Sequence, residues 1–242
     1  RAKASWKTTA EGFDVKLDSL AFANLAVAGS ARGSYRYTGQ GPGEIDLTAN
    51  VDRGDARVVW RYMPHVVNAE ARNWIRRALV AGQGSQGRLV LKGNLQDFPF
   101  RDGKGGKFVV TARAVGGKVD YVQGWPVIDN IDADLTFGVG MKLEARKGVI
   151  LGARLSDVTV VIPDFESHEE LLLVKGLAQG PTAEFLRFLD LSPVGDSIDR
   201  FTEGMKASGN GRLDLDLAIP LRRPHETRVR GEYRFDNNIL EP

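Results

Sequence analysis

The sequence contains no cysteine, no long apolar run and no marked excess of charge of one sign. The absence of cysteine among 242 residues excludes disulfides, thiolate metal sites and thiol nucleophiles from this segment. No stretch approaches the roughly 20 apolar residues that a membrane-spanning helix needs. Lysine and arginine total 33 against 31 acidic residues, a formal charge of +2, which argues against a dedicated nucleic-acid binder.

The beginning of the chain also lacks familiar targeting signals. It starts at Arg1 rather than at Met, and residues 1–10 do not have the pattern of a signal peptide. We therefore expect the chain to be a segment of a longer protein, with its targeting and anchoring information outside this segment.

What the sequence does contain is a long succession of segments in which apolar and polar residues alternate. Side chains in a strand point to opposite faces in turn, so each such segment is apolar on one side only. We predict a mainly β fold of curved antiparallel sheet, whose apolar face must be covered by helices, by another sheet or by a ligand held in a groove. The residues expected to line such a groove are Ile131, Leu135, Phe137, Leu213, Leu215, Leu217 and Ile219.

Only two stretches have helical periodicity, and we expect both to form short helical regions packed against the sheet. The first runs from Val67 to Val80, with Asn68 as its N-cap and Gly82 after its end, and the second runs from Pro181 to Met205. The residues expected to pack these helices or to cover the groove are Trp74, Ile75, Leu79, Phe185, Phe188 and Leu189.

The order of these patterns indicates how the chain is organised. We expect one segment of a longer protein, with sub-units at residues 1–64 (strands), 65–180 (a helix and a β-meander) and 181–242 (helices and closing strands). A further strand is predicted from Arg57 to Tyr62, ending at Pro64.

Two glycine-rich stretches have a superficial likeness to phosphate-binding loops. Gly82, Gly84 and Gly87 spell G-x-G-x-x-G, but a helix precedes them and a strand follows, the reverse of the dinucleotide-binding order. We predict a loop connector there. The stretch 103–107 lacks the spacing and the Ser or Thr of a phosphate loop, so we predict a polar hairpin.

The acidic and histidine residues were considered as catalytic or metal-binding groups. Asp129, Asp132, Asp134, Asp214 and Asp216 alternate with apolar residues, as expected for the solvated face of half-buried strands. The histidines His65, His168 and His225 are far apart and have no metal-binding spacing. We therefore expect no enzymatic activity, no metal and no cofactor.

Several short pieces occur in an order and spacing that resembles the YhdP branch of the AsmA-like bacterial envelope proteins. The resemblance covers approximately residues 58–221. The pieces are Arg61–Pro64 (RYMP), Asn73–Ala78 (NWIRRA), Gly93–Phe100 (GNLQDFPF), Trp125–Pro126, Ile162–Asp164 (IPD), Gly176–Pro181 (GLAQGP) and Ser192–Val194 (SPV).

This resemblance implies the periplasmic portion of a protein anchored in the inner membrane, with tandem β units that form a long apolar groove. It further implies bridge-like transfer of phospholipid between the inner and outer membranes in support of outer-membrane lipid homeostasis. The expected partners are phospholipid acyl chains, the inner membrane through an anchor outside this segment, and other envelope proteins, but not nucleic acid. The alternative left open by the residues is a structural or partner-binding β scaffold of the cell envelope, whose apolar face is filled by the helices or by a second sheet.

Overall fold

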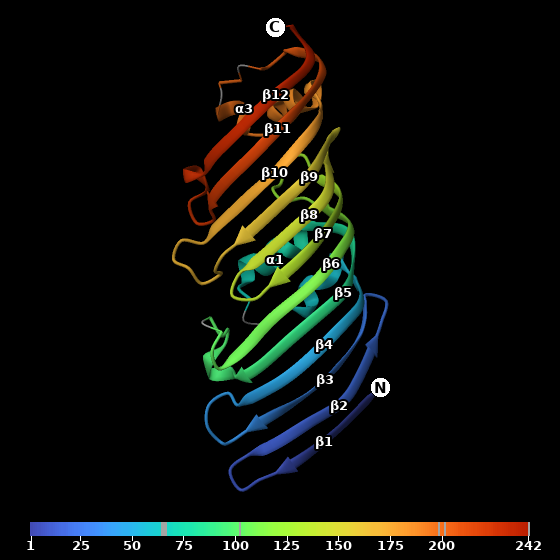
Figure 1. Ribbon diagram of the computed structural model, residues 1–242, viewed down its shortest axis with the longest axis vertical. Helices are drawn as coiled ribbons and strands as arrows, with labels where there is room; N and C mark the ends of the chain where they lie inside the picture. Colours follow the sequence, from blue (N-terminus) through green and yellow to red (C-terminus); the bar gives the residue numbers. More distant parts are fainter. Residues whose placement is uncertain (64–66, 102, 198, 201, 242) are drawn as a thin grey trace.

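A computed structural model describes the chain from residue 1 to 241 except for residues 64–66, 102, 198 and 201. It forms one sheet of twelve strands, arranged in the order of the sequence, and every strand is antiparallel to the next (Figure 1). The strands are β1 (Ala2–Thr8), β2 (Phe13–Ala23), β3 (Val27–Tyr37), β4 (Glu44–Asp55), β5 (Leu79–Asn94), β6 (Gly106–Val119), β7 (Ile128–Phe137), β8 (Met141–Ile150), β9 (Ala153–Ile162), β10 (Leu171–Pro181), β11 (Lys206–Pro220) and β12 (Arg228–Glu241).

The sheet is curved and does not close on itself. Its strands follow one another along the longest axis of the molecule, and β1 and β12 are the edge strands at opposite ends (Figure 1). Eleven spacings of about 4.8 Å between neighbouring strands make the sheet roughly 50 Å long. The predicted fold class, a curved antiparallel sheet with a few short helices, is confirmed.

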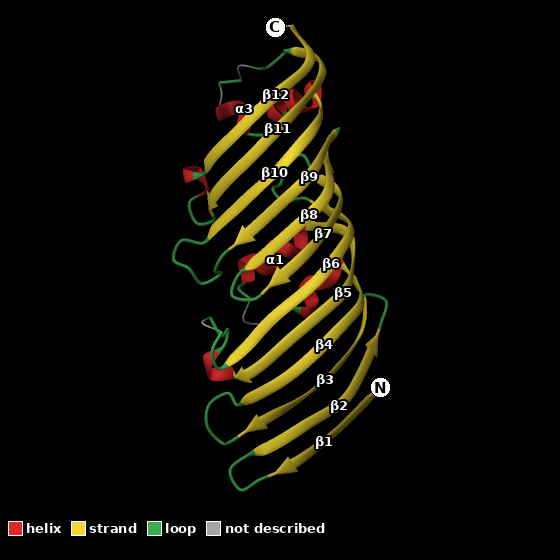
Figure 2. Cartoon of the chain, viewed as in Figure 1, coloured by secondary structure: helices red, strands yellow, loops and turns green. Residues whose placement is uncertain are grey.

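The connections differ between the two margins of the sheet. One margin carries the β1–β2, β3–β4, β5–β6, β7–β8, β9–β10 and β11–β12 connections, with the short 3₁₀ helices η2 (Leu95–Asp97) and η3 (Pro224–Glu226). The other margin, which we call the helical margin, carries η1 (Ala56–Tyr62) and α1 (Ala69–Ala78) between β4 and β5, and α2 (Thr182–Asp190) and α3 (Val194–Ser197) between β10 and β11 (Figure 2). No helix in the described part of the chain is long and apolar enough to cross a membrane.

The first predicted helix is present but shorter than expected. Asn68 is its N-cap as predicted, because the Asn68 Oδ1 accepts a hydrogen bond of 2.7 Å from the Ala71 N–H. The helix ends at Ala78 rather than near Gly82, since Leu79 already pairs with Val119 as the first residue of β5.

Two local predictions about the β4–β5 region are wrong. The segment from Arg57 to Tyr62 is a 3₁₀ helix rather than a strand, and it begins where the Asp55 carboxylate accepts a bond of 2.9 Å from the Arg57 N–H. Pro64, predicted to end that segment, lies outside the described residues. The glycines of the G-x-G-x-x-G stretch lie within β5 rather than in a loop connector.

The second helical region is only partly as predicted, because α3 ends at Ser197 and the described residues between there and Met205 form turns instead of helix. Pro181 is the N-cap of α2 rather than its first helical residue, and α3 begins at Val194, directly after the expected Ser192 and Pro193. The predicted polar hairpin at 103–107 is confirmed, since its described residues make the turn into β6.

Candidate lipid groove

Strand register places apolar side chains in continuous rows across the sheet, which we call the apolar face. Paired residues in neighbouring strands lie on the same face, so a chain of pairs traces one row. The first row runs through nine strands as Ala2, Leu20, Ala31, Ala49, Leu89, Val110, Phe137, Met141 and Ile162. The second runs from β6 to β12 as Ala112, Leu135, Leu143, Val160, Val174, Leu217 and Val229.

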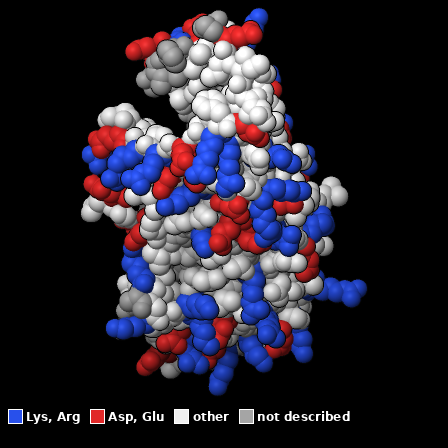
Figure 3. All heavy atoms as spheres, turned by 45° about the horizontal axis from the view of Figure 1, so that its top comes forward, with Lys and Arg blue, Asp and Glu red and all other residues white. Residues whose placement is uncertain are grey.

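The opposite face, which we call the polar face, shows the reverse pattern in the neighbouring rows. One row from β6 to β12 reads Arg113, Asp134, Glu144, Thr159, Lys175, Asp216 and Arg230. Ion pairs connect many of these side chains, such as Lys175 to Asp216 at 2.8 Å. Basic and acidic side chains are interspersed over the surface seen in Figure 3, as expected for a solvated sheet face.

Four of the five acidic residues named in the sequence analysis, Asp129, Asp132, Asp134 and Asp216, take part in such pairs. Lys147 lies 3.1 Å from Asp132, Lys118 lies 3.2 Å from Asp129, and Arg146 pairs with Asp134. These basic partners and their hydrogen bonds hold the pKa of Asp134 below its ordinary value, and for Asp132 the Gly116 N–H contributes most to lowering the pKa. Within the described residues, no cluster of three histidine or acidic side chains is able to hold a metal ion.

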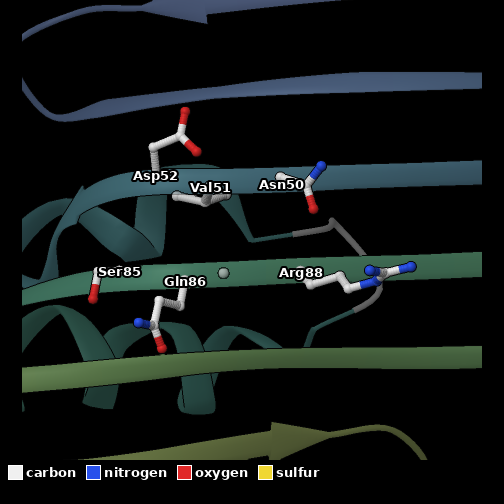
Figure 4. A pocket seen from close by; sticks show the side chains of 7 residues that line it. Asn50, Val51, Asp52, Ser85, Gln86 and Arg88 are labelled. Carbon is white, nitrogen blue, oxygen red and sulfur yellow. The ribbon is translucent and has the colours of Figure 1, made fainter.

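A depression of about 470 Å³ lies on the polar face between β4 and β5 (Figure 4). Asn50 of β4 and Arg88 of β5 pair with each other across the two strands, and Figure 4 shows their side chains in front of the sheet with helices behind it. These two residues line the depression from the polar face. Its lining is mostly polar, comprising Asn50, Val51, Asp52, Ser85, Gln86, Gly87 and Arg88. This depression is therefore unsuited to acyl chains, unlike the face behind it.

The described residues form no second layer that buries the apolar face throughout. In the described part of the chain, the buried apolar residues are Ala78, Phe100, Ala133, Ala145 and Ala153, and no large side chain is fully buried. A water-soluble domain of this size would ordinarily bury many large apolar side chains in one core. The sheet thus presents a long apolar surface that is only partly covered.

The predicted groove residues all lie on this face. Leu135 and Leu217 share the second row, and Phe137 lies in the first. Leu215 pairs with Gly176 and Gly231, and Leu213 pairs with Ala178 and Tyr233. Ile131 pairs with Gly117, and Ile219 pairs with Leu172. Each of the seven is half-buried.

The predicted cover residues meet along the helical margin through a chain of aromatic contacts. Trp74 of α1 donates a hydrogen bond of 3.0 Å from Nε1 to the Tyr121 carbonyl, and the Tyr121 ring lies 5.9 Å from Trp125. Trp125 in turn meets Phe188 of α2 edge-to-face, with 5.9 Å between ring centroids. Burial raises the pKa of Tyr121 to about 12, with a smaller contribution from the charge of Asp120.

At the C-terminal end, α2 packs directly on the apolar face. Phe185 lies edge-to-face on Tyr233 at 5.0 Å, and the Tyr233 hydroxyl lies 2.9 Å from the Thr182 hydroxyl. Gly211 makes room for this arrangement, since a Cβ built there would stand 1.9 Å from the Tyr233 hydroxyl oxygen.

The remaining predicted cover residues, Ile75, Leu79 and Leu189, contribute to the ends of the helices. The Ile75 carbonyl accepts from the Leu79 N–H, and the Leu189 carbonyl accepts from the Ser192 N–H at 3.3 Å. The helices therefore join the sheet at one margin and lie on the side of its apolar face.

The sequence analysis missed the N-terminal half of this face and the two linking aromatics, Tyr121 and Trp125. The N-terminal strands carry the same alternation as β11, seen at Leu47 and Leu89, so that signal was available. The contact between Trp125 and Phe188 joins residues 63 positions apart and has no counterpart in sequence periodicity.

The sequence is similar to those of known proteins. The YhdP protein family model matches residues 1–241. The intermembrane phospholipid transporter YhdP of Escherichia coli (strain K12) is 30% identical over 247 residues, which cover 99% of this chain and 19% of that protein. The chain thus spans about a fifth of the length of this curated relative. No solved structure matches the chain.

Proposed function

The chain belongs to the YhdP family, and on that premise we propose that it is a segment of a bridge-like lipid transfer protein. In this proposal the apolar face carries phospholipid between the inner and outer membranes and thereby supports outer-membrane lipid homeostasis. The observation that carries the proposal is the unbroken apolar rows across twelve strands, together with the lack of a large buried core in the described residues.

The physical argument concerns the cost of apolar surface in water. Each methylene removed from water contributes about 0.8 kcal/mol, so a phospholipid with two long acyl chains cannot cross water readily. An apolar face roughly 50 Å long exceeds the half-thickness of a bilayer core, about 15 Å, and so accommodates extended acyl chains. The bound chains in turn shield the apolar face from water.

The division of the surface suits this role. Ion-paired side chains keep the polar face in water, while the apolar face meets the acyl chains. The residues that we propose to contact lipid are the seven predicted groove residues and their neighbours in the two apolar rows. Trp74, Phe185 and Phe188 belong to the cover along the helical margin.

We further propose that this segment lies in the periplasm, within a protein anchored to the inner membrane by a region outside it. The named relative is an intermembrane transporter, and such a location places the apolar face between the two membranes. Transport requires no bond to be made or broken, so we propose that the segment carries lipid without chemical conversion.

Native mass spectrometry of the purified segment tests the proposal. We expect phospholipid to co-purify with the folded chain and to be released by organic extraction. A folded chain that remains free of lipid after exposure to phospholipid vesicles would instead support the scaffold alternative. A matched control is an ordinary soluble β protein purified and exposed to vesicles in the same way.

A further inference from the structure

The connection between β4 and β5 gathers arginine side chains around one indole ring. The Arg76 Cζ atom lies 4.7 Å from the ring centroid of Trp60, and the Arg61 Cζ atom lies 5.3 Å from it. Arg72 also reaches this residue, donating a bond of 3.2 Å from Nη1 to the Trp60 carbonyl. Arg77 follows Arg76 in the last turn of α1.

Three of these cations have no ion-pair partner within the described residues. The salt bridges of the described chain include none that involves Arg61, Arg76 or Arg77. By contrast, Arg57 in the same 3₁₀ helix pairs with Asp55 at 2.6 Å. Arg61 and Arg76 both lie against the Trp60 ring, and Arg77 adjoins Arg76 in sequence, so an anion near this ring gains a favourable interaction with the cations.

The elements η1 and α1, which carry these cations, and the start of β5 also carry exposed apolar side chains. Val59, Tyr62, Trp74 and Val80 are 41%, 52%, 43% and 42% exposed, respectively. Arginine interspersed with exposed aromatic and aliphatic side chains is typical of surfaces that meet the boundary between lipid headgroups and acyl chains.

The position of the cluster also relates it to the apolar face. The Ala78 side chain at the end of α1 is fully buried, and the next residue, Leu79, begins β5 and pairs with Val119 of the apolar face. The α1 helix lies behind the strands in Figure 1 and continues directly into the sheet. The guanidinium groups therefore stand at the margin of the apolar face, where a headgroup would lie if its chains lay on the strands.

We propose that Arg61, Arg76 and Arg77 form a binding site for the phosphate of a phospholipid whose acyl chains lie on the apolar face. A guanidinium group presents its N–H donors in a planar fork that matches two phosphate oxygens. Cation–π contact with Trp60 holds two of the three groups in place. This inference rests on the proposed function, and it assigns the headgroup end of the lipid to the helical margin.

Calorimetric titration of the whole 242-residue chain with short-chain lipids below their micelle concentration tests the site. The probes are dihexanoylphosphatidylglycerol, dihexanoylglycerol without the phosphate, and inorganic phosphate. The test variant combines Arg61→Gln, Arg76→Gln and Arg77→Gln. The control variant combines Arg32→Gln, Arg88→Gln and Arg230→Gln, which remove the same charge from exposed positions on the polar face.

We expect the test variant to bind the phosphatidylglycerol roughly tenfold or more weakly than the parent, because it loses charge-assisted hydrogen bonds to phosphate. Its affinity for dihexanoylglycerol should stay unchanged, and the control variant should bind both lipids like the parent. Circular dichroism of both variants checks that the fold is retained.

Each other outcome has a distinct meaning. Equal loss of both lipids in the test variant, or loss only in the control variant, would refute the headgroup site while leaving the groove proposal intact. Inorganic phosphate bound as tightly as the phosphatidylglycerol would refute a lipid headgroup as the ligand. Failure of the parent to bind either lipid would refute the proposed function itself.

Discussion

Placing a charge on the apolar face distinguishes an open groove from a closed core. Leu135 lies in the middle of β7, between Ala112 and Leu143 in the second apolar row, and is half-buried. Thr136, the next residue, is exposed on the polar face and pairs with Lys142. Leu135→Asp and Thr136→Asp therefore introduce the same group at adjacent positions on opposite faces.

The expected magnitudes follow from the partial burial of Leu135. Full burial of a leucine side chain is worth about 1.5–3 kcal/mol, so losing a half-buried one should lower the free energy of unfolding by about 1 kcal/mol. A carboxylate sealed without a partner in a closed core would instead cost several kcal/mol. On the open face the new charge stays hydrated, but it lies where acyl chains must pass.

The assay pairs urea unfolding, followed by circular dichroism, with the amount of phospholipid that co-purifies per folded chain. For Leu135→Asp we expect modest destabilisation and a roughly tenfold loss of bound lipid, since desolvating the charge opposes acyl-chain binding. Thr136→Asp should retain lipid like the parent. If Leu135→Asp stays folded and keeps its lipid, the open-groove reasoning is wrong. If Leu135→Asp unfolds, the result favours a closed scaffold. Leu217→Asp repeats the test on β11.

Three further predictions concern the helical margin. Gly211→Ala should lower the free energy of unfolding by about 1–3 kcal/mol, because the new methyl group would stand 1.9 Å from the Tyr233 hydroxyl oxygen. The control Gly231→Ala, whose new methyl group would have its nearest side-chain atom at 3.5 Å, should destabilise the chain less. Equal urea midpoints for the two variants would contradict this prediction. Trp125→Ala removes the aromatic contacts that link α1 and α2. Amide hydrogen exchange in both helices should therefore accelerate, while exchange in β1–β3 stays unchanged. Unaltered protection of the helix amides would count against this link. The raised pKa of Tyr121 favours the neutral phenol in the folded state, so the contribution of this group to folding stability is complete below about pH 10 and is lost as the pH rises towards 12. Tyr121→Phe should remove a phenolate absorbance component centred at about pH 12. An unchanged absorbance titration curve would refute the assignment.

The sheet was predictable from sequence because alternation in a strand directly reflects the two faces of a sheet. Segments such as Leu213–Ile219 predicted both the strand and the side that is apolar, and the α1 stretch was recognisable by its helical period. Which strands pair, and in what register, depends on contacts between segments far apart, so the continuity of the apolar rows became visible only in the structure.

The local errors have identifiable physical causes. Val58, Trp60 and Tyr62 alternate with arginine or valine like a strand, but the Asp55 side chain caps a 3₁₀ turn there instead. Glycine usually marks a turn, yet Gly82 lies in β5, where its Cα faces the close backbone of Gly117.

The arginine cluster could not be predicted because it depends on how two helices fold together. Arg61 and Arg76 are fifteen positions apart, and only the packing of η1 beside α1 brings both to Trp60. In sequence, Arg72, Arg76 and Arg77 form only a basic helix face, which is usually a solvated surface.

Site-specific photo-crosslinking in the intact protein tests the central claim most directly. A benzophenone amino acid is placed at Leu47 and Leu217 on the apolar face, and at the adjacent Asp46 and Asp216 on the polar face. We predict phospholipid adducts from the two leucine positions and none from the two aspartate positions. Adducts from both faces alike, or none from Leu47 and Leu217 in a folded protein, would contradict the account.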